Sequence, residues 1–203
     1  RLQSNSDVVT VPRYATLSLV KTVTNNNGGT AVIGNFTLTA TGTTPISGTS
    51  GSANVTNKVV VPGVYALSET TLAGYTASAW SCSAGSLSGS NLTLANGQTA
   101  TCTINNIKRP TLVVRKISNG GTGTFGFSGP NGVLTENIAT TTAGATFTGG
   151  TATLLAHDTI TTITETMPAT FWQIETATCA GMGTGGTAIL AGNVLTLNAA
   201  ATA

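Results

Sequence analysis

The second half of this chain repeats the first, and this duplication constrains the fold more than any other feature of the sequence. Residues 15–107 can be laid over residues 110–203, with ATLSLVK (15–21) matching PTLVVRK (110–116). A steady offset over a domain-sized unit indicates two tandem domains rather than short solenoid repeats. Three residue pairs fix the offset at 95, 96 and 97 positions: Lys21 and Lys116, Glu69 and Glu165, Cys82 and Cys179.

Each copy has the pattern of short β-strands. Threonine supplies 42 of the 203 residues and glycine 25, which favours strands joined by tight turns. Apolar and polar residues alternate, and no segment keeps a helical period. The sequence therefore predicts an all-β fold of two tandem antiparallel β-sandwich domains, with a partly open barrel as the alternative for each. The strand-like segments of the first copy are TLSLV (16–20), NFTLTA (35–40), SANVTNKVVV (52–61), YALSET (65–70), NLTLA (91–95) and TATCTIN (99–105).

The repeat also predicts the domain boundaries. We place the first domain at residues 15–107, a linker at 108–110 and the second domain at 111–203. Residues 1–14 have no counterpart in the repeat and form an N-terminal extension. The second copy stops at LTLNAAATA, before a segment corresponding to TCTINN (101–106), so we expect the second domain to lack its last strand.

The N-terminal extension contains a short alternating stretch, namely Val8, Val9, Thr10 and Val11. A sandwich without one strand leaves backbone groups unpaired and exposes an apolar groove. This stretch is therefore a candidate donor strand for the second domain of the next subunit, which would propagate head-to-tail. The alternative is that the chain continues past Ala203 and supplies its own last strand.

The cysteines are separated in a way that suggests one disulfide. Cys82 and Cys102 flank a predicted hairpin with 19 residues between them, which fits a disulfide, although two buried free thiols are the alternative. Cys179 corresponds to Cys82, and its expected partner would fall a few residues beyond Ala203. It is therefore predicted to be unpaired, which favours the alternative in which the chain continues.

Charge and motifs exclude several classes of function. Eight basic and six acidic residues give a net charge of +2, too little for a surface that follows phosphates, so we expect no nucleic-acid partner. The sequence has no run of 18 apolar residues, so we expect no membrane insertion. The one histidine, His157, lies in the other copy from the Cys82–Cys102 pair, so we predict no metal site. No cofactor motif or catalytic constellation is present, and we expect neither a cofactor nor an enzyme.

Three segments of the first copy resemble one family. These are the LVK of the first strand (19–21), the YALSET…AGYT stretch (65–76) and the TINN ending (103–106), and they resemble Cna protein B-type and SpaA-like domains. The resemblance implies a prealbumin-like, transthyretin-like sandwich of the kind found in bacterial surface proteins and pilins. This sequence departs from the family at one point, because the proline that usually follows the glutamate is absent from SETTLAGY (68–75).

The resemblance also implies an intramolecular isopeptide bond. By position, Lys21 is the nucleophile, Glu69 the catalyst and Asn106 the acceptor, with Asn105 as the alternative acceptor. A buried lysine can attack as a neutral amine, and a buried carboxyl group can move the proton. The alternative is a lysine that only pairs with the glutamate. The second copy has Lys116 and Glu165 but no final strand that carries an asparagine.

Two functions remain. The first is a structural subunit of an extracellular bacterial filament, pilus or surface stalk, a homopolymer of identical subunits, because weakly charged, threonine-rich strands leave sheet edges poorly protected against assembly. The alternative is a ligand-binding adhesin module of a larger secreted or cell-surface protein, which would bind a surface or host ligand with its loops.

Overall fold

The computed structural model describes residues 14–182 and 186–198, and this part of the chain is built almost entirely from β-strands. Its only helical element is one turn of 3-10 helix, η1 (Ile33–Asn35). None of the helical structure in these residues is long and apolar enough to cross a membrane. The all-β fold class predicted from the alternation is confirmed.

The chain forms two compact units. Among the described residues, the first takes in residues 14–106 apart from 24–30 and 74–76, and the second takes in these two segments and residues 107–182 and 186–198. We call strands β1–β10 the first domain and strands β11–β17 the second domain. Strand β10 ends at Lys108 and β11 begins at Thr111, so Lys108 belongs to a strand although the sequence placed it in the linker. The predicted boundaries themselves stay a prediction.

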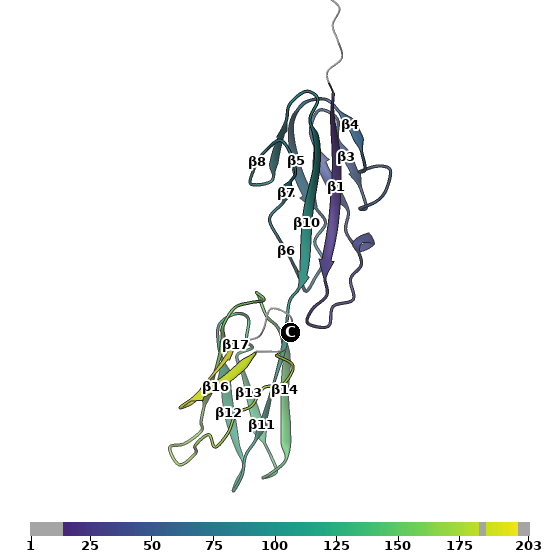
Figure 1. Ribbon diagram of the computed structural model, residues 1–203. Coiled ribbons are helices and arrows are strands. Elements are labelled where there is room, and N and C mark those ends of the chain that lie inside the picture. The colour runs from purple at the N-terminus through teal and green to yellow at the C-terminus, as the bar shows by residue number, and fades with distance from the viewer. Residues whose placement is uncertain (1–13, 183–185, 199–203) are drawn as a thin grey trace, which may run out of the picture. The chain divides into compact units, whose positions relative to one another are not determined.

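The first domain is a sandwich of two sheets (Figure 1). One sheet has the order β3-β2-β5-β9-β8, and the other has the order β4-β1-β10-β6, with β7 also paired to β10. The strands are β1 (Ala15–Thr24), β2 (Leu38–Thr41), β3 (Ile46–Gly48), β4 (Lys58–Val60), β5 (Gly63–Glu69), β6 (Tyr75–Ala77), β7 (Ser81–Cys82), β8 (Ser86–Ser88), β9 (Asn91–Leu94) and β10 (Thr99–Lys108).

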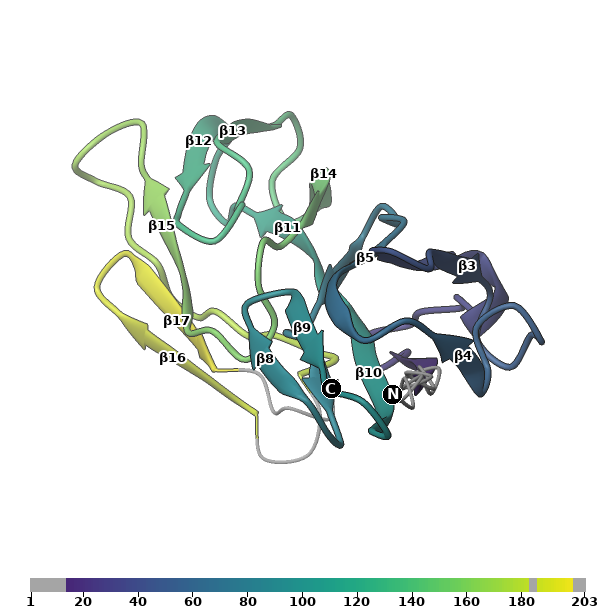
Figure 2. The ribbon, with the colours of Figure 1, turned by 90° about the horizontal axis from the view of Figure 1, so that it is seen from above.

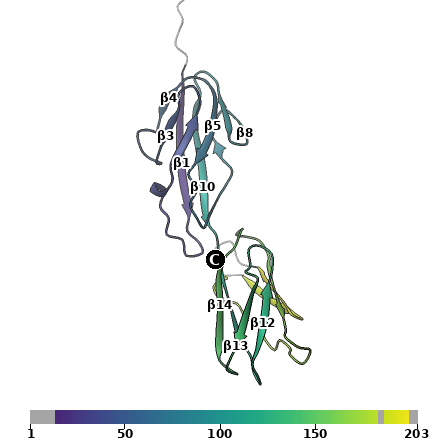
Figure 3. The same cartoon turned by 180° about the vertical axis from the view of Figure 1, so that it is seen from behind.

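Strand β10 lies between β1 and β6 and runs parallel to β1. The amide of Thr16 donates to the carbonyl of Gln98, and further along Lys21 Nζ donates to the carbonyl of Ile104. The two contacts join residues 82 and 83 positions apart, and such a constant separation requires strands that advance in the same direction. The arrowheads of β1 and β10 point the same way in Figure 1 and Figure 3. The other pairs with a described register are antiparallel.

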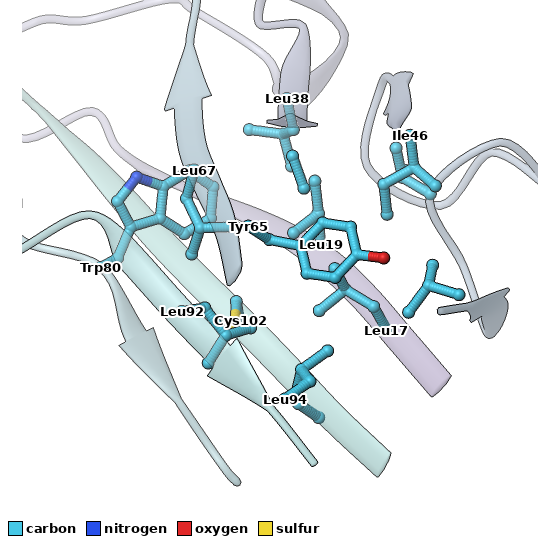
Figure 4. Packing of buried hydrophobic residues seen from close by; sticks show 14 of the residues in the cluster. Leu17, Leu19, Leu38, Ile46, Tyr65, Leu67, Trp80, Leu92, Leu94 and Cys102 are labelled. Carbon is cyan, nitrogen blue, oxygen red and sulfur yellow. The ribbon is translucent and has the colours of Figure 1, made fainter. Parts of the chain in front are cut away.

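Alternating residues from both sheets fill the core of the first domain. Leu17 and Leu19 of β1 face Tyr65 of β5 and Leu92 of β9, and all are almost fully buried (Figure 4). Each such side chain contributes about 1.5–3 kcal/mol through the removal of apolar surface from water. The disulfide between Cys82 and Cys102 joins β7 to β10, and the Cys102 side chain belongs to the same core.

One predicted strand is shorter in the structure. The alternation in SANVTNKVVV (52–61) predicted a strand throughout, but β4 covers only Lys58–Val60. Asn57 adopts a left-handed backbone conformation with φ of 50°, which cannot continue an extended strand. Val55 is nevertheless fully buried, and its carbonyl accepts a hydrogen bond from Leu19, so the loop packs on the core without joining a sheet.

The second domain repeats this plan with fewer strands. One sheet has the order β13-β12-β15-β17-β16, and Figure 2 shows its β16–β17 hairpin in yellow. The other sheet, among residues 14–182 and 186–198, consists of β11 and β14 alone. The strands are β11 (Thr111–Ile117), β12 (Gly123–Ser128), β13 (Glu136–Thr140), β14 (Thr146–Thr153), β15 (Thr161–Thr166), β16 (Thr187–Ala191) and β17 (Val194–Asn198).

Replacing Cys82 and Cys102 together by alanine should lower the free energy of unfolding of the first domain. The loss should be about 3 kcal/mol, because the bond closes a loop across a separation of 20 residues. Urea unfolding measures this difference, and Cys179→Ala is the matched control with a smaller expected change. Non-reducing peptide mapping should find Cys82 joined to Cys102. Linkage of either residue to Cys179, or an unchanged stability of the double variant, would contradict this assignment.

Candidate functional site

The first domain buries an ion pair between its two sheets. Lys21 on β1 and Glu69 on β5 lie 2.8 Å apart, from Nζ to Oε2, and the lysine side chain has no solvent-exposed surface. The amine also lies 4.6 Å from the centre of the Phe36 ring. Alternation along β1 explains this burial, because Lys21 follows Leu17 and Leu19 on the inward face.

Burial changes the acid–base behaviour of this lysine. Desolvation lowers the pKa of the Lys21 amine from its usual value, and the Glu69 carboxylate opposes the shift through its hydrogen bond and its charge. A lysine with a lowered pKa is neutral, and therefore nucleophilic, over a wider pH range than an exposed lysine. Its site thus favours reaction more than a surface ion pair would.

The two candidate acceptors on β10 face opposite sides of the sheet. Asn106 is 2% exposed, and its Oδ1 accepts no hydrogen bond among the described residues. Asn105 is half-buried, and its Oδ1 accepts a hydrogen bond from Thr22 Oγ1 at 3.0 Å. Lys21 Nζ reaches the carbonyl of Ile104, which lies on the same face of β10 as Asn106. The geometry therefore places Asn106, rather than Asn105, on the side of the lysine.

Lys21, Glu69 and Asn106 are the residues that the predicted isopeptide bond requires. A neutral Lys21 amine would attack the Asn106 carboxamide carbon, and the Glu69 carboxyl group would move the proton to the departing ammonia. The orphaned Asn106 oxygen is consistent with such a role, because a buried acceptor without a partner is costly. In the structure the lysine and glutamate form an ion pair, and the isopeptide bond stays a prediction.

The second domain carries the same pair. Lys116 on β11 and Glu165 on β15 lie 2.7 Å apart, from Nζ to Oε1, with 14% and 9% of their side chains exposed. The Lys116 amine lies 4.3 Å from the centre of the Phe125 ring, close to the 4.6 Å between Lys21 and Phe36. Neither ring was predicted from the sequence to lie beside these pairs. The repeat could have indicated both rings, because Phe36 and Phe125 occupy matching positions in NFTLTATG (35–42) and TFGFSGPNG (124–132).

The two domains differ in what lies beside the lysine strand. In the first domain β1 is paired on one side with β4 and on the other with β10. In the part of the second domain that the structure describes, β11 is paired with β14 alone. The inward residues of β1 are buried, whereas Leu112, Val114 and Lys116 of β11 are only half-buried. Among the described residues nothing pairs with the other edge of β11, and this edge, called the free edge of β11 below, is the position that β10 occupies in the first domain.

The cysteines differ in the same way. Cys82 is bonded to Cys102 of β10, whereas Cys179 is a free, partly buried thiol that packs against the core of the second domain. Burial raises the pKa of the Cys179 thiol, and a hydrogen bond to the Ala180 carbonyl opposes the shift. The segment around Cys179 (173–182) forms no strand, although its counterpart in the first domain contains β6 and β7, which both pair with β10.

The remaining residues that the sequence suggested as functional add nothing to the two lysine–glutamate sites. Val8, Val9, Thr10 and Val11, the candidate donor strand, lie outside the described residues. His157 Nε2 lies 3.6 Å from Asp158 Oδ2 in a loop. The described residues contain no group of three or more histidine, cysteine, aspartate or glutamate side chains that could hold a metal ion.

Comparisons with known proteins agree with this geometry. A family model described as a prealbumin-like fold domain matches residues 13–104, and a second model with the same description matches residues 112–203, both of the SpaA type. The chain belongs to the SpaA-type prealbumin-like domains. The resemblance seen in the LVK, YALSET and TINN segments is confirmed, as is the arrangement of two tandem sandwich domains.

The comparisons beyond the family are distant. One solved structure, titled "The Bacillus anthracis TIE protein", is similar at 14% sequence identity with a TM-score of 0.31. The similarity covers 93% of this chain and 31% of the other, so the chain spans about a third of that protein's length. No curated protein matches the chain.

The intact mass of the chain should be lower than the sequence mass by one ammonia if Lys21 is bonded to Asn106. Glu69→Ala should restore the full sequence mass, because the carboxyl group that moves the proton is lost. Asn105→Ala is the matched control and should keep the ammonia deficit. A wild-type mass equal to that of the plain sequence would remove the isopeptide bond from this account.

Proposed function

We propose that the chain is a non-enzymatic structural part of an extracellular bacterial filament, pilus or surface stalk. Membership of the family supports a structural role, because SpaA-like domains are found in bacterial surface proteins and pilins. The Cys82–Cys102 disulfide supports an extracellular location, since disulfides persist mainly in oxidising compartments. The two domains place their charged pairs inside sandwiches, where they can stabilise the fold.

The free edge of β11 carries the proposal for assembly. An unpaired strand edge presents backbone donors and acceptors that another strand can satisfy. The half-buried Leu112 and Val114 behind this edge add apolar surface that an incoming strand would cover. More specifically, we propose that copies assemble by donor-strand exchange. In this mechanism Val8–Val11 of one copy adds to β11 of the next, and the copies join head-to-tail as a homopolymer.

A second candidate is a ligand-binding adhesin module, and one loop supports it. Phe171 is 82% exposed, and residues on both sides of it in the sequence line a shallow, open hollow. Aromatic side chains on exposed loops are common in binding surfaces. The lining residues are Met167, Pro168, Ala169, Thr170 and Trp172.

Electron microscopy of the purified chain should show filaments, and deletion of residues 1–13 should leave folded monomers that tend to aggregate. The deletion removes the donor strand and leaves the β11 edge exposed. Filaments of normal length from the deletion variant would contradict donor-strand exchange by this extension. Monodisperse particles from the wild type would favour the adhesin.

A finer variant pair tests whether a strand docks through one face. Val9 and Val11 lie on one face of the extension, and Val8 and Thr10 on the other, if residues 8–11 form a strand. The face with two valines, Val9 and Val11, is the one expected to dock. Aspartate at both Val9 and Val11 should therefore abolish filaments, whereas aspartate at both Val8 and Thr10 should not. Equal effects of the two double variants would contradict strand docking. Phe171→Ala is expected to leave filaments unchanged.

A further inference from the structure

We infer that the disulfide of the first domain is a redox switch that opens under tension. It resists thiols while the domain is folded, and a small thiol such as glutathione reduces it once a pulling force has separated β1 from β10. The switch rests on the proposed function only in that a filament or surface stalk carries tension along its chain. It adds a regulation of length to that role and uses strands and side chains of the first domain alone.

Strands β1 and β10 form a pair that a pulling force loads in shear. Each is ten residues long, they run parallel side by side, and contacts join Thr16 to Gln98 and, further along, Thr22 to Asn105 (Figure 1). The chain enters the pair at the start of β1 and leaves it at the end of β10, and in a parallel pair these are opposite ends. A force along the chain therefore slides the two strands past one another and loads their hydrogen bonds together. We call this pair the β1–β10 clamp.

The disulfide lies in the path that carries this force. Cys102 is on β10 near its start, and Cys82 is on the neighbouring strand β7. Once the clamp opens, the chain becomes taut through the sulfur–sulfur bond, and the residues between the two cysteines stay outside the loaded path. The two cysteines are 20 positions apart in the sequence. Reduction should therefore lengthen the extended chain by about 70 Å, at roughly 3.6 Å per residue.

In the folded domain both sulfur atoms are poor targets for a thiolate. Cys102 is completely buried in the core cluster that also contains Leu92, so a thiol cannot approach its sulfur (Figure 4). Cys82 is half-buried and packs against the same core. Attack at Cys82 would release the Cys102 sulfur as a thiolate inside an apolar core, where an unpaired charge is costly. Burial thus protects the bond from both directions of attack.

Tension removes this protection because β10 carries both the pairing with β1 and the buried sulfur. Alternate residues of β10 face the core, namely Ala100, Cys102 and Ile104. When a force draws β10 away from β1, these side chains leave the core together and the disulfide meets solvent. The bond is then both exposed and under load, so a thiolate can reach either sulfur.

Reduction takes two glutathione thiolates. The first attacks one cysteine sulfur, the sulfur–sulfur bond breaks, and the other cysteine leaves as a thiolate that takes up a proton. The second attacks the resulting mixed disulfide, which frees the remaining cysteine and yields glutathione disulfide. Two electrons pass from two glutathiones to the protein, and residues 83–101 are then free to extend.

The amide predicted between Lys21 and Asn106 would carry the load in place of the clamp. That bond would join β1 to β10 directly, and the segment between the two residues includes both cysteines. Tension would then not reach the disulfide. Asn106→Ala removes the acceptor and isolates the clamp, and the wild type shows which of the two bonds bears the load in the native chain.

Single-molecule pulling of the full chain, held by handles at its two ends, tests the switch. Without thiol, the opening step of the first domain should be about 70 Å shorter than in the chain with Cys82→Ala and Cys102→Ala, which identifies that step. With glutathione, a further step of about 70 Å should follow this opening and never precede it. We expect the same result from the wild type and from Asn106→Ala. The second domain is an internal control, because Cys179 is a free thiol and the step of that domain should not change.

Reduction without tension provides the matched comparison. Glutathione should reduce the bond in the folded chain at least about a hundredfold more slowly than in the urea-unfolded chain, because reduction has to wait for the fold to open. Thiol labelling followed by peptide mapping measures both rates at Cys82 and Cys102.

A pair of proline variants locates the clamp. Successive amides of a strand point to opposite edges, and the amide of Thr16 faces the β10 side through its hydrogen bond to Gln98. The amide of Thr22 therefore faces β10, whereas that of Val23 faces the opposite edge. Thr22→Pro should lower the force at which the first domain opens, and Val23→Pro should change this force less. The length of the step should stay the same in both variants.

Equal reduction rates in the folded and urea-unfolded chains, or an additional step that precedes opening, would overturn the inference. A wild type without the first-domain step would do the same, because the amide between β1 and β10 would then bear the load. Filaments of a chain that shows no tension-dependent reduction would support the proposed function and overturn the inference. Tension-dependent reduction in a chain that forms no filaments would support the inference and contradict assembly into a homopolymer.

Discussion

Pairing of the first strand of the first domain, β1, on both of its edges is the constraint on which the rest of this structure depends. In the first domain β4 and β10 pair with β1 from the two sides, and the residues behind β1 are fully buried as a result. Lys21 can be buried there because Glu69 pairs with its charge. Backbone pairing, core burial and the buried ion pair are therefore parts of one arrangement.

The second domain shows what changes when one of those partners is not among the described residues. The lysine, its glutamate and the aromatic ring keep their geometry, because they come from β11, β15 and β12. The inward face of β11 is only half-buried, the thiol at Cys179 is free, and the segment around it forms no strand. These residues are the counterparts of residues that lie beside β10 in the first domain.

The sequence predicted the fold class and the positions of the paired residues well, because both depend on local alternation and on the repeat. It could not predict the parallel pairing of β1 with β10, since alternation carries no information about strand direction. It overextended the strand at 52–61, because the left-handed conformation of Asn57 is a property of the loop. The choice between Asn105 and Asn106 also required the structure, since adjacent residues face opposite sides of a strand.

Amide hydrogen exchange in the monomeric chain tests most directly whether the β11 edge is open. Backbone amides of β1, paired on both sides, should exchange slowly, whereas the amides of β11 that do not face β14 should exchange much faster. These β11 amides should become as protected as those of β1 once a strand has added to the edge. Equal protection of β11 and β1 in the monomer, before any strand is added, would contradict it.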